Sequence, residues 1–108
     1  MFKAFFDTSR IDAFVADVVQ EVQRQLPPAD VAKAAERRRE KLLLALVRKV
    51  EQLLGQGPLN FFQKAKLGTR LQDALEAAGY PQEFSKSFAY DITVQVARSV
   101  APAPKRDA

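Results

Sequence analysis

Hydrophobic residues in the first part of the chain recur with the spacing of an α-helix. After Thr8 and Ser9 they follow one another at intervals of three and four residues, which places them along one stripe of a helix. Ser9 with Asp12 three positions later resembles a capping box, and Pro27-Pro28 ends the pattern. The sequence therefore predicts a first helix whose buried face consists of seven residues: Ile11, Phe14, Val15, Val18, Val19, Val22 and Leu26.

The longest predicted helix covers residues 30–54, from Asp30 as N-cap to Gly55 as stop signal. Its length of roughly 37 Å exceeds the radius of gyration of about 13 Å expected for a globule of this size, so we expect it to be the central element. Two residues interrupt its pattern. Arg39 falls in the middle of the apolar face, and Leu44 falls nearly opposite that face. Apolarity on two sides around residues 42–47 indicates a helix that is covered on two sides.

A joint is expected at Gly68-Thr69, because Thr69 with Gln72 has the spacing of a helix cap. We therefore predict one short helix over 60–67 and another over 70–78. The last element, residues 82–99, steps by four like a helix, yet its 92–96 part alternates like a strand. Because no other segment alternates in a way that offers a partner strand, helix is the preferred interpretation.

These patterns predict an all-α protein, a compact domain of four to five helices over residues 1–100 around the long helix. The tail 101–108 has no apolar anchor and is expected to be disordered. The longest apolar run has six residues, from Leu42 to Val47, whereas a membrane span needs about 20. We therefore expect no membrane span and a cytoplasmic protein.

The composition limits the chemistry that the chain can perform. It has no histidine and no cysteine, which removes the commonest general base, the usual nucleophile arrangements and nearly all zinc sites. Its four glycines are scattered and form no phosphate-binding loop. We accordingly expect no enzyme, no cofactor and no metal site.

The net charge of +4 is concentrated in one segment. Residues 33–49 carry seven basic side chains against Glu36 and Glu40, which amounts to +5 and leaves −1 for the remainder of the chain. A basic segment of this kind can bind nucleic acid, but a solvated charged helix face is the more common explanation. The residues that such binding would use are Lys33, Arg37, Arg38, Lys41, Arg48 and Lys49.

Association with a protein partner, or with a second copy as a homo-oligomer, is the preferred functional hypothesis. Three N-terminal phenylalanines would point away from the buried stripe of the first helix if that helix extended to them. Arg39 on the apolar face indicates that the intramolecular core ends near residue 40, and small residues before it leave room for another chain. The predicted partner-binding residues are Phe2, Phe5, Phe6, Val31, Ala35, Arg39 and Leu44.

Two other binding modes are weaker on the sequence. Residues 60–79 are no helix-turn-helix that could approach phosphates, because Asp73 and Glu76 oppose only Arg70 in the second half. Attachment of the phenylalanine-rich N-terminus to an anionic membrane surface has only Lys3 and Arg10 to support it.

Overall fold

The computed structural model describes residues 7–100, with Val100 described by its backbone only. Five α-helices and one 3₁₀ helix occupy this part of the chain, and no strand occurs in it. The all-α prediction with four to five helices is confirmed, and residues 92–96 are helical. The tail 101–108 lies outside the described residues. In chain order the elements are α2 (Ser9–Gln25), η1 (Pro28–Lys33), α3 (Glu36–Ala45), α4 (Val47–Leu54), α5 (Phe61–Ala77) and α6 (Gln82–Val100).

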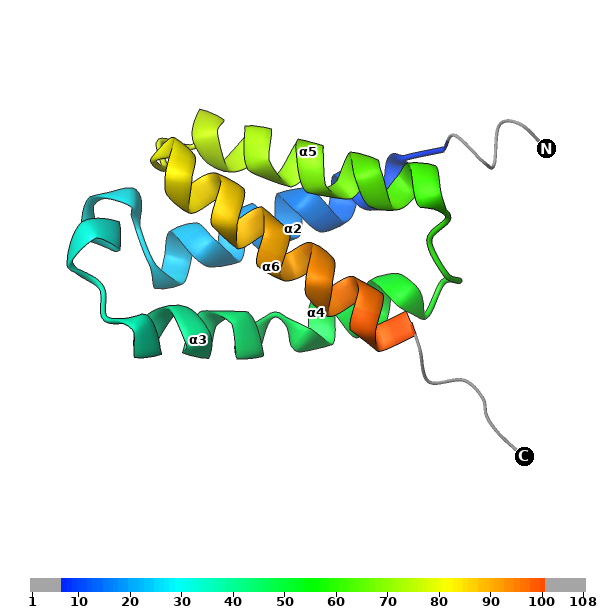
Figure 1. The fold of residues 1–108 in the computed structure, drawn as a ribbon, viewed down its shortest axis with the longest axis horizontal. Helices are drawn as coiled ribbons and strands as arrows, with labels where there is room; N and C mark the ends of the chain where they lie inside the picture. Colours follow the sequence, from blue (N-terminus) through cyan, green and yellow to red (C-terminus); the bar gives the residue numbers. More distant parts are fainter. Residues whose placement is uncertain (1–6, 101–108) are drawn as a thin grey trace.

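The helices form two layers. Helix α5 runs along one long edge of the molecule and α3 with α4 along the other, while α6 crosses diagonally in front of α2 (Figure 1). Both α2 and α6 contact α5 and α4. The body measures 46 × 32 × 19 Å, and its shortest dimension matches two helices of about 10 Å each.

One hydrophobic core lies between the layers. The predicted face of the first helix is confirmed, because six of its seven residues are buried and Val19 packs partly against them. Leu42, Leu46 and Val50 face the same core from α3, the α3–α4 junction and α4, and Phe88 of α6 is fully buried opposite them. Among the described residues, no helix is long and apolar enough to cross a membrane.

The long helix predicted over 30–54 is divided into three parts. Residues 28–33 form the 3₁₀ helix η1, and the extended backbone of Ala34 and Ala35 separates it from α3. At Leu46 the backbone N–H is shared between the carbonyls of Leu42 (3.2 Å) and Leu43 (3.1 Å). Gln95 Nε2 of α6 also donates to the Leu43 carbonyl at 3.2 Å. A side chain inserted at a helix carbonyl weakens the regular ladder, which accounts for the break between α3 and α4.

The joint predicted at Gly68 is wrong, because α5 is continuous through it. The capping box lies earlier, at the true start of the helix: Asn60 Oδ1 accepts the Gln63 N–H at 2.8 Å, and Gln63 Oε1 accepts the Asn60 N–H at 3.0 Å. Gly68 serves packing instead. A Cβ at this position would lie 3.3 Å from Thr93 Oγ1, so glycine lets α6 approach α5 closely.

The start of the first helix also differs from the prediction. Thr8, rather than Ser9, is the N-cap residue, and its side chain makes no capping hydrogen bond. The Ser9 N–H instead donates to Asp7 Oδ1 at 2.9 Å. Hydrogen bonds from Ser9 hold the pKa of the Asp7 carboxyl below its usual value. The predicted capping box would have satisfied the Ser9 N–H through the Asp12 side chain. In the structure Asp7, which precedes the helix, accepts this hydrogen bond instead.

Candidate partner-binding site

A pocket of about 350 Å³ lies where η1 and the start of α3 face the start of α6. It brings together Val31, Ala35 and Arg39, three residues that the sequence predicts to bind a partner. We call it the Arg39 pocket. Its lining consists of Leu26, Val31, Ala34, Ala35, Glu36, Arg39, Glu83, Phe84 and Ser87.

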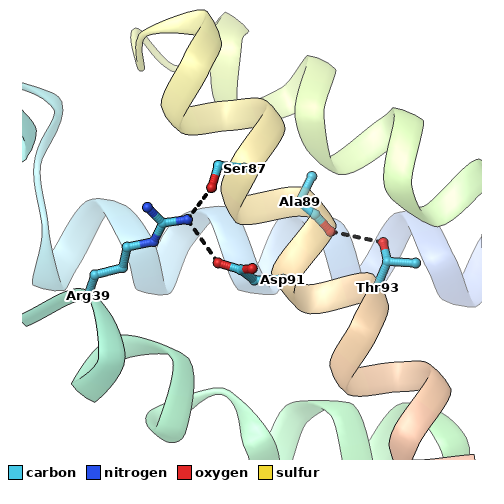
Figure 2. Close-up of polar contacts among 5 residues, drawn as sticks. All are labelled: Arg39, Ser87, Ala89, Asp91 and Thr93. Atoms are coloured by element: carbon cyan, nitrogen blue, oxygen red, sulfur yellow. Dashed lines mark hydrogen bonds and ion pairs between the residues drawn. The ribbon is translucent and has the colours of Figure 1, made fainter. Parts of the chain in front are cut away.

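Arg39 is held in place by three groups of α6. Its guanidinium donates to Asp91 Oδ2 at 2.8 Å and to Ser87 Oγ at 2.5 Å, as Figure 2 shows. The guanidinium carbon also lies 5.7 Å from the centre of the Phe84 ring, within the range of a cation–π contact. The side chain keeps 24% of its surface exposed, so it remains accessible from the pocket.

The Phe84 ring beneath Arg39 belongs to a stack of three aromatic rings. Tyr80, just before α6, stacks on Phe84, and Phe84 stacks on Phe88, with ring centres 5.2 Å and 5.4 Å apart. At the end of this stack the Tyr80 hydroxyl donates to the Leu26 carbonyl at 2.6 Å in a buried position. Burial raises the pKa of the Tyr80 hydroxyl, because the phenolate is poorly solvated there. This side of the pocket is therefore held by ring stacking and by a buried hydrogen bond.

The position of Arg39 on an apolar helix face now has a structural reason. Leu42 is the buried residue of α3. Arg39 lies one turn before it on the same side of the helix, where the buried face ends. The sequence left three environments open for its charge: a carboxylate, a partner or water at the end of the core. Asp91, which is 52 residues away along the chain, supplies the carboxylate. Its role towards a partner stays a prediction.

The remaining predicted partner-binding residues do not line this pocket. Leu44 is 70% exposed on α3, so the described part of the chain covers that helix on one side only. The expectation of a helix covered on two sides is therefore not met within residues 7–100. Phe2, Phe5 and Phe6 lie outside the described residues.

The basic residues of segment 33–49 are mostly exposed. Arg38 already has partners within the chain. Its guanidinium donates to the Gln25 carbonyl at 2.9 Å, and its Nη2 lies 3.6 Å from Asp30 Oδ2. Arg37, Lys41 and Arg48 follow one another by four and seven residues and share one exposed line along α3 and α4. Lys33 is exposed in η1, whereas Lys49 is half-buried.

The sequence did not single out two exposed aromatic residues. Phe61 at the start of α5 is 87% exposed, and Tyr90 in α6 is 68% exposed. Only one hint was available: Phe61 and Phe62 cannot both face the core of one helix. Tyr90 sits beside a second, larger groove between α5 and α6.

The described residues contain no group of three or more carboxylates that could hold a metal ion. Comparison with protein-family models, with curated proteins and with solved structures finds no match to this chain.

Proposed function

We propose that this protein acts without catalysis, by associating with a protein chain through the Arg39 pocket, and that a second copy of itself is the first partner to test. The observation that supports this most directly is the convergence of Val31, Ala35 and Arg39 on one preformed pocket. Preformed concave surfaces bind with a smaller ordering cost than surfaces that must rearrange.

The chemistry of the pocket suits a protein side chain. Leu26 and Phe84 give it an apolar floor, and Glu36, Glu83 and Arg39 give it a charged rim. Protein interfaces have this arrangement, with an apolar centre and a polar rim, and arginine is enriched among the residues that contribute most to affinity. Because Asp91 and Ser87 already orient Arg39, little side-chain entropy is lost when a partner contacts it.

The side chains around the pocket do not form a catalytic set. Ser87 accepts a hydrogen bond from Arg39, a group that cannot act as a general base, and the chain contains no histidine or cysteine. Glu36 and Glu83 are both exposed, on α3 and α6 respectively.

Sedimentation equilibrium over a concentration series tests self-association. Ala35→Glu places a charge in the pocket at an exposed position and should convert an associating protein into a monomer without changing its fold. Ala32→Glu is the matched control, since Ala32 is exposed in η1 but does not line the pocket. A wild-type chain that stays monomeric at high micromolar concentration, or an Ala35→Glu chain that associates normally, would contradict the proposal.

Nucleic-acid binding is the second candidate, favoured by the exposed line of Arg37, Lys41 and Arg48. Within residues 7–100 none of these three is in an ion pair, so their charges are available to phosphates. Three neutralised phosphates would give a slope of about −3 in a plot of log affinity against log salt. Replacing Arg37 and Lys41 by glutamate should abolish this binding, and absence of a gel shift at low salt with the wild type would exclude it.

A further inference from the structure

A groove of about 640 Å³ lies between α5 and α6. It is open to solvent along its length, and we call it the α5–α6 groove. Its floor is made of small residues, among them Ala65, Gly68 and Ala89. A Cβ on Gly68 would lie 3.3 Å from Thr93 Oγ1 of α6, so the glycine lets the two helices pack closely at this site. Small residues on two closely packed helices leave a trough into which a further helix can place its side chains.

Exposed aromatic surface borders this trough. Tyr90 lines the groove and is 68% exposed, and Phe61 lies one helical turn before Ala65 and is 87% exposed. Tyr90 adds exposed aromatic surface to the apolar groove, as is found at binding sites, and Phe61 adds exposed apolar surface to α5 outside the lining of the groove.

The length of the groove fits about two to three helical turns. On α5 it extends from Lys64 to Gln72, about 12 Å at 1.5 Å per residue, and on α6 from Glu83 to Thr93, about 15 Å. Apolar side chains at positions i, i+3 or i+4, and i+7 of a helix span about 10 Å. A groove of this length therefore accepts three such anchors. A small molecule in so open a groove would leave much of its surface in water, unlike ligands in typical small-molecule sites.

The charges of the groove favour an acidic occupant. Its ionisable lining residues are Lys64 and Lys86 against Glu83, which lies close to the start of α6. Neither lysine is in an ion pair within residues 7–100. Between these charges the floor is uncharged. Carboxylates on either side of an apolar stripe would meet the two lysines while the stripe fills the floor.

From these features we infer that the α5–α6 groove binds an amphipathic α-helix of a partner protein, with apolar anchors at i, i+3 or i+4, and i+7 and acidic residues on its flanks. The small apolar floor separates this site from a single-stranded nucleic-acid groove, which needs cations that follow the backbone for its whole length. This site is distinct from the Arg39 pocket, although Glu83 and Ser87 of α6 border both.

Binding of designed peptides to the full chain tests the inference. The probe is a synthetic helical peptide of about 14 residues with leucines at the three anchor spacings and glutamates on both flanks. Two further probes are the same peptide with lysines in place of the glutamates and an oligothymidylate. Affinity is measured by fluorescence anisotropy, and the contact surface is mapped by amide chemical-shift changes.

We expect the glutamate peptide to bind at least about tenfold more tightly than the lysine peptide and to shift amides around Ala65 and Tyr90. Ala65→Glu should weaken binding about tenfold or more, whereas Ala77→Glu, at an exposed α5 position outside the groove, should not. Tyr90→Ala should also weaken it, while Leu44→Ala, which removes an equally exposed side chain from α3, should leave it unchanged.

Charge reversal gives the most specific outcome. The double variant Lys64→Glu with Lys86→Glu should exchange the preference, so that the lysine peptide binds more tightly than the glutamate peptide. Equal binding of both peptides to the wild type, shifts that map elsewhere, or binding of the oligothymidylate alone would each overturn the inference. Ala35→Glu, which alters the Arg39 pocket, should leave peptide binding intact. The peptide result therefore does not depend on whether the Arg39 pocket binds a partner.

Discussion

Arg39 shows how one side chain can close the end of a core without being buried in it. A helical pattern calls for an apolar residue at this position, but α6 offers a carboxylate, a hydroxyl and an aromatic face within reach. The guanidinium is planar and carries several donors, so it can satisfy the carboxylate and hydroxyl from one position above the Phe84 ring. Lysine could not reproduce this geometry.

The Arg39–Asp91 contact should therefore contribute measurably to stability. A double-mutant cycle with Arg39→Met and Asp91→Asn, followed by urea unfolding, should give a coupling energy of about 0.5–1 kcal/mol. The control is the more exposed Arg70–Asp12 pair between α5 and α2, whose side chains keep 41% and 50% of their surface in solvent. Because exposed pairs are screened by water, its coupling should be smaller. A coupling for Arg39–Asp91 no larger than that of the control would contradict this account.

Tyr80 should make the stability of the protein pH-dependent in the alkaline range. Its pKa is raised above the usual value of 10.0, so the unfolded chain ionises first as the pH rises. The stability that results from this difference in the pKa of Tyr80 is fully present below pH 10.0. It is lost as the pH rises towards the higher pKa of Tyr80 in the folded protein. Tyr80→Phe should remove this dependence and cost about 1–2 kcal/mol at neutral pH, through loss of the bond to the Leu26 carbonyl.

The comparison for Tyr80 is Tyr90→Phe, because Tyr90 is largely exposed. Urea unfolding at neutral pH and at about pH 11 measures both variants. Tyr90→Phe should behave like the wild type at both pH values. A Tyr80→Phe protein that loses as much stability as the wild type between them would show that the buried hydroxyl is not responsible.

At the level of elements, local periodicity predicted which parts of the chain are helical, while the break at Leu46 and the continuity at Gly68 depend on contacts with distant residues. The first helix was predictable because its seven apolar residues lie on one stripe whatever surrounds it. The break at Leu46 depends on Gln95, and the continuity at Gly68 depends on Thr93, both of which come from α6. A local pattern contains no information about these tertiary partners, so a glycine that permits close packing looks the same as one that ends a helix.

Arg10 provides a test of how the helix ends are stabilised. It donates to the carbonyls of Leu53 (2.9 Å), Gly57 (2.8 Å) and Pro58 (3.1 Å), and so connects α2 to the end of α4. Arg10→Met should lower the free energy of unfolding by about 1–2 kcal/mol, because these carbonyls lose a charged donor. Arg48→Met, at an exposed position of α4, should change it by less than about 0.5 kcal/mol. Equal losses in urea unfolding would argue against a specific role for Arg10.

At the scale of the whole molecule, both candidate sites lie where separate helices meet. Val31, Ala35 and Arg39 belong to one short stretch, so the sequence could place that wall of the pocket. The opposite wall, with Phe84 and Ser87, comes from α6, and only the crossing of α6 over the other helices brings it there (Figure 1). The α5–α6 groove was hidden for the same reason, since it exists only when two helices pack together.

Because one core joins both layers, damage at its centre should weaken the entire described fold. Leu46 is fully buried at the junction of α3 and α4, whereas Leu44, two residues earlier, is 70% exposed. Leu46→Ala should therefore cost about 3 kcal/mol, from lost burial and the cavity left behind, and Leu44→Ala less than about 0.5 kcal/mol. Far-ultraviolet circular dichroism reports the helices, and tyrosine absorbance reports the packing around Tyr80. The two signals should shift together in Leu46→Ala, because a shared core unfolds cooperatively. A helix signal that outlasts the tyrosine signal would show that the two layers unfold separately.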